Sequence, residues 1–334
     1  MTPGRLVCPY CYESFRAWQI LFRCTGRKGR AGIACKRERD PVLAERMGRS
    51  EALPPVFKGN WLRASAPCPQ CGDMTPHRVC PVCHSDLPLH FARIGSRLIA
   101  TVGAKESGKT VFMTVLVHEL THRVGERFEA SVVGCDDTTR RRFESEYERR
   151  LYRDGALAAT TPSAATMAGG AAPLVFRFST QRDGLLGRAR ISRSLLSFFD
   201  TAGEDLTTQE SVQVNARYLA SADGIVVLLD PLQMEGGRRL AATGTRLPSL
   251  VPGDGAFHVL SRVTDLLQGT PGGRASGRIR KPTAVAFSKI DALWHRFGQG
   301  SPLRRQLDEA PAFDTTDSLQ VDEEVKALLH ELAS

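Results

Sequence analysis

The sequence predicts a mixed α/β protein, with a mostly parallel sheet flanked by helices that follows a small cysteine-rich module. From residue 97 onward, short apolar runs alternate with amphipathic segments of helical length. This alternation is typical of parallel strands joined by crossover helices. A glycine-rich octapeptide separates the first apolar run from the first helical segment, and eight of the nine cysteines lie before residue 84. We therefore expect a cysteine-rich module at residues 1–92 and an α/β domain at residues 93–334.

Composition excludes several classes of protein. The 334 residues are 42% hydrophobic, which is ordinary for a globular chain. No run approaches the ~18 consecutive apolar residues of a transmembrane helix, and the start lacks the apolar core of a signal peptide. We expect no membrane association and a cytoplasmic location, where thiols stay reduced and cysteines hold metal ions rather than form disulfides.

The net charge of +9 is concentrated in the cysteine-rich part. Residues 1–95 hold fifteen Lys or Arg against seven Asp or Glu, and the remainder holds thirty against twenty-nine. This positive field makes nucleic acid or another acidic molecule a candidate partner, or it serves only as a solubilising surface. No basic stripe interleaved with aromatic residues supports nucleic acid specifically.

Six of the cysteines form three knuckles of the form C-P-x-C, and Cys24 and Cys35 are single. Two thiolates at positions i and i+3 bind one tetrahedral ion, and two such turns complete a shell that selects zinc. We expect about two structural zinc ions, the alternative being one ion with free thiols nearby. Cys135 stands apart and is expected to be a small buried apolar residue. Taken in sequence order, the expected ligand sets are Cys8, Cys11, Cys24 and Cys35 for one ion, and Cys68, Cys71, Cys80 and Cys83 for the other.

The octapeptide matches the phosphate-binding pattern G-x-x-x-x-G-K-[ST]. It lies between a predicted strand, Leu98–Val102, and a predicted helix, Thr110–Arg123. In such a turn the free backbone N–H groups and the helix N-terminus bind an anion. Lys109 would reach the β- and γ-phosphates, and the Thr110 hydroxyl would coordinate Mg²⁺. The expected nucleotide-binding residues here are Gly103, Ala104, Lys105, Glu106, Ser107, Gly108, Lys109 and Thr110.

The remaining elements follow from apolar runs and helical periodicity. In the helix Thr138–Tyr152, for example, Phe143, Tyr147 and Leu151 share one face, and Asp136 or Asp137 can cap its start. Two segments rich in small residues, 158–172 and 271–281, are expected to be loops. The other expected strands are Phe128–Val133, Leu174–Ser179, Leu195–Asp200, Gly224–Asp230 and Thr283–Ser288, and the other expected helices are Thr207–Leu219, Ala256–Leu267 and Asp322–Leu332.

Two later motifs follow strands. Asp200-Thr201-Ala202-Gly203 has the D-x-x-G form, in which Asp200 can hold Mg²⁺ and the Gly203 amide can sense a γ-phosphate. In Ser288-Lys289-Ile290-Asp291, the Lys can lie along a flat base and Asp291 can accept two hydrogen bonds from guanine. Adenine lacks these donors, so it would leave a buried carboxylate unpaired. The alternative for the last motif is a solvated turn after a strand.

The order of these three motifs resembles the translation-factor-related class of P-loop GTPases. The run Phe199–Glu204 is similar to switch II of Ras-like proteins, and a zinc module before such a domain resembles bacterial double-GTPase proteins of proposed conflict or signalling systems. The resemblance implies a P-loop GTPase-type sheet, GTP or GDP with Mg²⁺ as ligands, and a protein partner, which could be a second GTPase. It also implies a switch-I threonine that helps to hold Mg²⁺. The candidates are Thr160, Thr161 and Thr166, of which we favour Thr161.

The chain departs from this family pattern at three places. Ser288 replaces the usual Asn or Thr, and no clear sixth strand follows Asp291, so the domain lacks a recognisable last strand. Glu204 stands where Ras-like proteins carry the Gln that orients the attacking water, and its charge would repel the γ-phosphate.

We expect a regulatory GTPase that binds GTP with Mg²⁺ and hydrolyses it slowly to GDP and phosphate, with Lys109, Thr161, Gly203 and Glu204 as the residues nearest the chemistry. The zinc module would dock a partner. The alternatives are a nucleotide-gated scaffold with little or no turnover, and a nucleic-acid-binding zinc protein with a GTPase switch.

Overall fold

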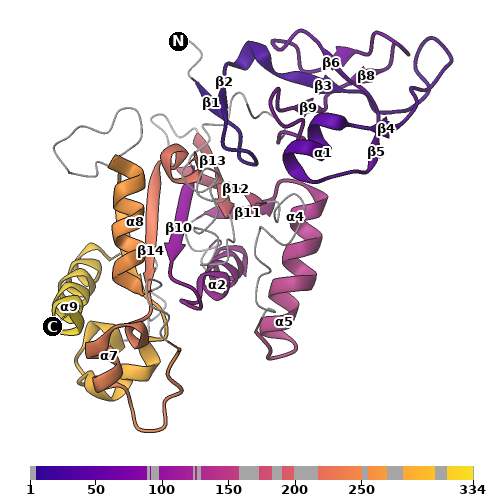
Figure 1. The fold of residues 1–334 in the computed structure, drawn as a ribbon. Helices are drawn as coiled ribbons and strands as arrows, with labels where there is room; N and C mark the ends of the chain where they lie inside the picture. The colour runs from indigo at the N-terminus through magenta and orange to yellow at the C-terminus, as the bar shows by residue number, and fades with distance from the viewer. Residues whose placement is uncertain are drawn as a thin grey trace.

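The computed structural model describes residues 5–88, 91, 98–122, 125, 129–157, 173–182, 190–198, 217–249, 255–268, 281–304 and 314–333. They form a strand-rich amino-terminal part and an α/β part that packs against it (Figure 1). None of the described helices is long and apolar enough to cross a lipid bilayer.

The amino-terminal part is built from very short strands. β3 (Leu21–Arg23) pairs antiparallel with both β6 (Val56–Lys58) and β9 (Arg78–Val79). Three two-stranded pairs surround this sheet: β1 (Leu6–Val7) with β2 (Ser14–Phe15), β4 (Glu38–Arg39) with β5 (Ala52–Leu53), and β7 (Ala66–Pro67) with β8 (Met74–Thr75). Strands of two or three residues bury little apolar surface, so further cross-links are needed to hold them together.

One buried ion pair fixes helix α1 (Pro41–Met47) against β3. Asp40 caps the helix by accepting a hydrogen bond from the Leu43 amide, and its other carboxylate oxygen lies 3.1 Å from Arg23. His84 Nδ1 lies 3.0 Å from the same carboxylate. Arg23 also donates to the carbonyls of Pro54 and His84, so one guanidinium ties several turns together.

The α/β part contains the expected parallel sheet. β10 (Ile99–Gly103), β14 (Gly224–Leu229) and β15 (Thr283–Phe287) run parallel in that order. The register pairs Gly103 with Leu228, and Leu229 with Phe287. The carboxyl ends of all three strands therefore meet at one edge. Among the described residues after β15, the chain forms 3-10 turns and a helix but no strand.

A second sheet is antiparallel, which the sequence pattern did not indicate. β12 (Leu174–Arg182) lies between β11 (Ala130–Gly134) and β13 (Arg190–Phe198), and both of its pairings are antiparallel. β13 also lies against β10. The Tyr218 hydroxyl joins the two sheets, because it accepts from the Thr101 amide of β10 at 3.1 Å and lies 3.4 Å from the Ser197 carbonyl of β13.

Helices cover both faces of the α/β part (Figure 1). On one side, α2 (Lys109–His122) packs with a continuous helical segment made of α4 (Asp137–Arg142), the π-helical η3 (Phe143–Glu148) and α5 (Arg149–Tyr152). Met113, Val117, Phe143 and Tyr147 bury this face against β11–β13.

On the other side, α8 (Ala256–Gln268) and α9 (Thr315–Ala333) share a core with β10 and β14. The shorter elements are η1 (Ala17–Gln19), η5 (Pro231–Gln233), α7 (Glu235–Leu240), η6 (Ile290–Arg296) and η7 (Pro302–Arg304). Most of the expected helix Thr207–Leu219 lies outside the described residues.

Candidate functional site

The octapeptide forms the turn between β10 and α2, as its pattern predicts. Gly103 ends the strand, Lys109 begins the helix, and Gly108 has a φ of 82°, a left-handed conformation that favours glycine. A Cβ on Gly103 would lie 2.5 Å from Ser107 Oγ and 2.7 Å from the Leu228 carbonyl oxygen. Both glycines are therefore needed for this backbone path.

The polar groups of the turn have the features of a phosphate cradle. Lys109 Nζ donates to the carbonyls of Gly103 and Ala104, at 3.0 and 2.8 Å, and thus folds back across the loop. Ser107 is fully buried, and no described group hydrogen-bonds to its Oγ. A buried hydroxyl without a partner is costly unless a ligand completes its hydrogen bonding. Lys105 is held through its carbonyl, which accepts from Gln233 Nε2 at 2.6 Å.

The Ser288-Lys289-Ile290-Asp291 motif lies at the same edge of the sheet. Ser288 packs against the phosphate loop, because a Cβ on Gly108 would lie 3.6 Å from Ser288 Cβ. Lys289 immediately precedes η6 and has a left-handed backbone conformation, with a φ of 48°. Asp291 lies in the first turn of η6, and its side chain is exposed. The structure thus brings the first and third motifs together.

Sequence reasoning missed Asp230, which it treated only as the end of a strand. This residue is completely buried after β14, caps η5 through the Leu232 amide and lies 2.6 Å from Lys289 Nζ. A buried carboxylate paired with Lys289 fixes the lysine stem at the sheet edge. The sequence feature that could have indicated this role is an aspartate directly after an apolar strand, the position that Asp200 also has in the D-x-x-G motif.

The structure does not describe four of the predicted site residues: Thr161, Asp200, Gly203 and Glu204. Their roles as switch and Mg²⁺ residues therefore remain predictions.

The eight amino-terminal cysteines form two clusters of four, but the grouping expected from sequence order is wrong. Cys8 and Cys11 lie with Cys80 and Cys83, and Cys24 and Cys35 lie with Cys68 and Cys71. The reason is the antiparallel pairing of β3 with β9. Leu21, at one end of β3, pairs with Val79 beside the Cys80 knuckle, whereas the Arg23 carbonyl at the other end accepts from Thr75 near the Cys71 knuckle.

The sulfur geometry of both clusters suits a tetrahedral ion. Sulfur–sulfur distances are 3.8 and 3.9 Å in the first cluster and 3.6 Å for both contacts in the second. A tetrahedral zinc with Zn–S bonds of about 2.3 Å has edges of roughly 3.8 Å, whereas a disulfide would need about 2.05 Å. The amides of Tyr10, Gly26 and Val82 donate to cysteine sulfurs at 3.3–3.4 Å.

Two thiols of the first cluster have pKa values that are shifted strongly in opposite directions. Burial raises the pKa of Cys8 well above its usual value. Hydrogen bonds from Cys11 and Cys8 hold the pKa of Cys83 well below its usual value. Crowded thiolates in a buried place need a positive ion to be stable, so the donor set fits a soft divalent cation.

Comparison with known proteins agrees with the motif order. The family model of Double-GTPase 2 matches residues 97–330. The chain belongs to the Double-GTPase 2 family. A protein of Mycolicibacterium smegmatis, "Putative ESX-1 scaffolding and assembly protein SaeC", is 26% identical over 350 residues, which cover 96% of this chain and 83% of that protein. The likeness to SaeC therefore extends beyond the residues that the family model matches.

In this double-GTPase chain the first cysteine cluster packs directly on the α/β part. Cys8, Tyr10 and Phe15 share a buried cluster with Val175 of β12 and Leu195 of β13. Tyr10 donates through its hydroxyl to Asp136 Oδ2, at 2.8 Å, just before α4. The module is thus joined to the α/β part by a continuous core.

The knuckle of Cys8 and Cys11 contacts residues on both sides of segment 199–216. On the amino-terminal side, Ser197 Oγ donates to the Pro9 carbonyl at 2.8 Å and lies 3.3 Å from the Tyr12 hydroxyl. On the carboxyl-terminal side, the rings of Tyr12 and Tyr218 lie 4.9 Å apart, and Ser221 Oγ donates to the Tyr12 carbonyl at 3.0 Å.

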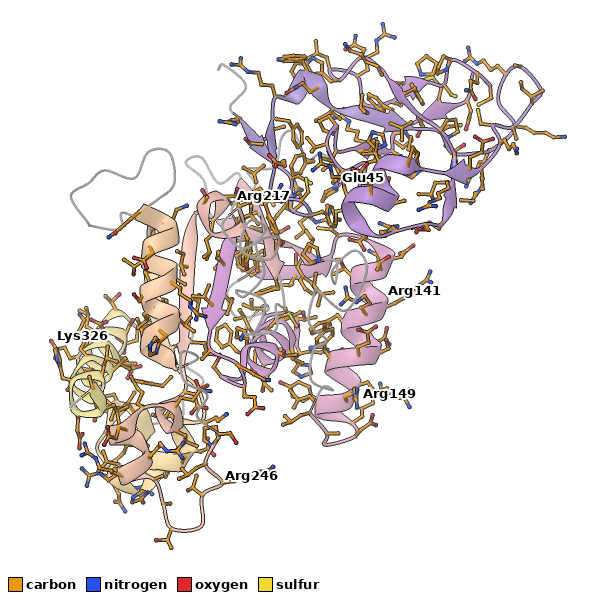
Figure 2. All side chains as sticks on the ribbon, in the orientation of Figure 1. Glu45, Arg141, Arg149, Arg217, Arg246 and Lys326 are labelled. Carbon is orange, nitrogen blue, oxygen red and sulfur yellow. The ribbon has the colours of Figure 1, made fainter. Side chains whose placement is uncertain are left out.

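An ion pair extends this contact. Arg217 lies 2.8 Å from Glu13, and Figure 2 shows Arg217 where the amino-terminal part meets the α/β part. Segment 199–216 contains the predicted switch residues Asp200, Gly203 and Glu204. The residues that bracket this segment are therefore held by one cysteine knuckle.

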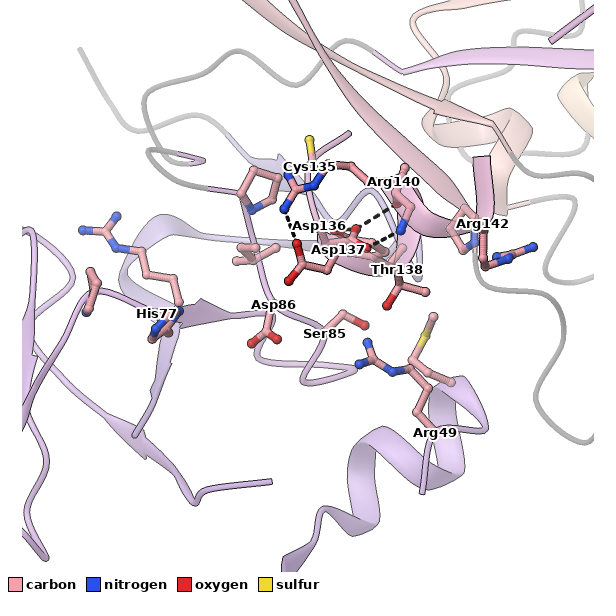
Figure 3. A pocket seen from close by; sticks show the side chains of 18 residues that line it. Arg49, His77, Ser85, Asp86, Cys135, Asp136, Asp137, Thr138, Arg140 and Arg142 are labelled. Atoms are coloured by element: carbon pink, nitrogen blue, oxygen red, sulfur yellow. Dashed lines mark hydrogen bonds and ion pairs between the residues drawn. The ribbon is translucent and has the colours of Figure 1, made fainter. Parts of the chain in front are cut away.

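A cavity of about 520 Å³ lies beside this junction (Figure 3). His77, Ser85 and Asp86 line it from the amino-terminal part, Cys135 from the β11–α4 turn, and Arg140 from α4. Cys135 is half-buried rather than fully buried, and burial raises its pKa to about 12. Cys135 belongs to neither four-cysteine cluster, in agreement with its expected separation from the metal ligands.

Proposed function

We propose that this protein is a regulatory GTPase that binds GTP with Mg²⁺ and hydrolyses it slowly to GDP and phosphate. One observation carries the proposal: in a chain of the Double-GTPase 2 family, the phosphate loop and the Ser288–Asp291 motif meet at one edge of the parallel sheet. Ligands of open α/β sheets bind at the carboxyl ends of the strands, which is where both motifs lie.

The roles of the residues follow from their chemistry. Lys109 would exchange its bonds to the Gly103 and Ala104 carbonyls for phosphate oxygens and, with the loop amides, stabilise the charge that develops during transfer. Mg²⁺, held by Thr110, Thr161 and Asp200, would neutralise charge on the phosphates. The Gly203 amide would sense the γ-phosphate.

Base selection would depend on the third motif. Asp291 would accept hydrogen bonds from the N1–H and amino group of guanine, and the stem of Lys289, fixed by Asp230, would lie along the base.

We also propose that each four-cysteine cluster holds one structural Zn²⁺. The sulfur spacing and the buried thiols support this. Zinc would cross-link strands that are too short to form a stable module without it. The contacts of Tyr12 with Ser197, Tyr218 and Ser221 support a role for the module in docking a partner and coupling it to the nucleotide state.

A nucleotide-gated scaffold with little or no turnover is the second candidate. The name of the related SaeC describes scaffolding and assembly, which favours a protein partner. The partner could be a second GTPase, as the family's name suggests. Glu204 in place of a water-orienting Gln also favours slow or absent hydrolysis.

Single-turnover hydrolysis on the isolated full chain tests the first proposal against the second. We expect a rate of ~10⁻⁴ s⁻¹ or below, on the scale of unassisted Ras. Glu204→Gln should raise the rate, or leave it unchanged if Glu204 faces solvent, and Lys109→Ala controls for contaminating GTPases. Tight GTP binding without phosphate release would favour the scaffold, and a rate near ~1 s⁻¹ would contradict slow turnover.

A further inference from the structure

The carboxyl-terminal end of α2 carries a metal-binding pattern that the nucleotide site does not use. Residues 118–122 read His-Glu-Leu-Thr-His. On a helix, His118 and His122 at i and i+4 lie on the same face. The pattern H-E-x-x-H on a helix is that of zinc sites in metalloproteases, where the two histidines are ligands. Sequence reasoning overlooked it, because this helix was considered only as the continuation of the phosphate loop.

The fold brings a carboxylate to the two histidines. Glu148, on η3, lies with Oε1 2.8 Å from His118 Nδ1 and 4.0 Å from His122 Nδ1. Ligand atoms of these three residues all lie within 4.8 Å of one another, so small side-chain rotations would bring them around one ion. Two histidines and one glutamate are an established ligand set for zinc that leaves a fourth position open.

The surroundings hold the two imidazoles in place. His122 Nδ1 lies 3.0 Å from the His118 carbonyl, to which it can donate, so Nε2 keeps the lone pair that a metal needs. Histidine ligands of metals usually donate their other N–H in this way. His118 stacks between two rings, with centroid distances of 3.7 Å to Tyr152 and 4.2 Å to His122.

An irregular helix turn places the carboxylate. Glu148 is the last residue of the π-helical stretch Phe143–Glu148, whereas the residues on either side are α-helical. Phe143 and Tyr147 stay buried against the sheet within this stretch. Such π-turns are rare and occur frequently at functional sites.

We propose that His118, His122 and Glu148 bind one divalent cation of the zinc class, separate from the two four-cysteine clusters. The ion would replace the proton between His118 and Glu148 and would tie α2, which begins at Lys109, to the α4–α5 helix. The alternative is that these residues bind no ion and form only a half-buried His–Glu pair with stacked rings. Uptake of metal distinguishes a metal site from such a pair.

The test is a calorimetric titration of zinc into the full chain whose cysteine clusters are already loaded, without nucleotide. We expect one further zinc per chain. His118→Ala and His122→Ala should abolish this uptake, and Glu148→Gln should weaken it at least tenfold. His258→Ala, which removes an exposed histidine from α8, should leave it unchanged. Loading with cobalt should add an ion whose spectrum lacks thiolate charge-transfer bands.

His122→Ala removes one ring that stacks on His118 but keeps the His118–Glu148 contact, so loss of uptake in this variant cannot be attributed to loss of that contact. The proposal is overturned if the parent takes up no further zinc, or if uptake survives His118→Ala. Uptake unaffected by Glu148→Gln would also overturn it, because the two histidines alone would then account for the binding. The titration contains no GTP, so its result is independent of the proposed GTPase activity.

Discussion

Lys109 shows how one side chain can serve two sets of partners in the phosphate loop. Its ammonium group now bonds the Gly103 and Ala104 carbonyls, and the proposed function needs it on the phosphates. We predict that Lys109→Ala weakens Mg·GTP binding at least 100-fold, measured by calorimetry, because the loop loses the cation that offsets the phosphate charge. An unchanged circular dichroism spectrum is the control, and equal affinity in the variant and the parent would contradict the assignment.

Removal of the Asp40 charge should destabilise the amino-terminal part. Asp40→Asn keeps the helix cap but leaves the guanidinium of Arg23, 5% exposed, without its buried partner. We predict that it lowers the free energy of unfolding by about 3 kcal/mol, measured by urea unfolding of the metal-loaded protein.

The stability lost in Asp40→Asn should depend on pH. Burial alone would raise the pKa of Asp40, but the Leu43 amide, His84 and Arg23 together hold the pKa below its usual value. A lowered pKa contributes stability that is complete above the unfolded pKa of about 4 and is lost as pH falls through the folded value. The difference between parent and variant should therefore shrink below about pH 4, and a constant difference would rule out this charge effect.

At the scale of elements, the positions of the strands could be predicted from the sequence, but the direction of each strand relative to its neighbours could not. Apolar runs placed the six strands that the structure describes in the α/β part, with ends up to five residues away from those expected. Local periodicity does not say whether neighbours run parallel, and β12 and β13 turned out antiparallel. The expected strands Leu174–Ser179 and Leu195–Asp200 left residues 180–194 between them, enough for a parallel crossover, which needs a dozen or more residues. β12 and β13 extend further towards each other and leave only residues 183–189.

The cysteine knuckles show the same limit. The C-P-x-C spacing identifies which two cysteines share a turn, because i and i+3 thiolates meet in any such turn. Which turns share an ion depends on the pairing of β3 with β9, a contact between residues far apart in the sequence. The phosphate loop was easier to predict, because its whole geometry is local.

Matched cysteine variants test whether the first cluster is coupled to the nucleotide site. Cys83→Ser should release one zinc and change GTP affinity about fivefold, the lower end of typical coupling energies, because its cluster holds the residues bracketing segment 199–216. Cys71→Ser, in the other cluster, should release one zinc with little effect on GTP. Zinc analysis combined with nucleotide titration measures both, and equal effects of the two variants would refute the coupling.

The whole molecule depends on a core shared by its two parts. Val175 and Leu195 are completely buried beneath residues of the cysteine-rich module. We predict that a chain of residues 93–334 alone exposes this apolar face and associates on size-exclusion chromatography, with a lower Tm than the full chain. A monomeric fragment with the parent's Tm would mean that the module contributes nothing to the α/β part.

The central claim is that the edge shared by the phosphate loop and Asp291 binds guanine nucleotides, and comparison of Mg·GTP with Mg·ATP by calorimetry tests it most directly. The full chain should bind GTP at least ~100-fold more tightly than ATP, since adenine cannot donate to Asp291. Asp291→Asn should shift the preference towards xanthosine triphosphate, which offers a carbonyl where guanine offers an amino group. Equal affinity for ATP and GTP in the parent chain would contradict the account.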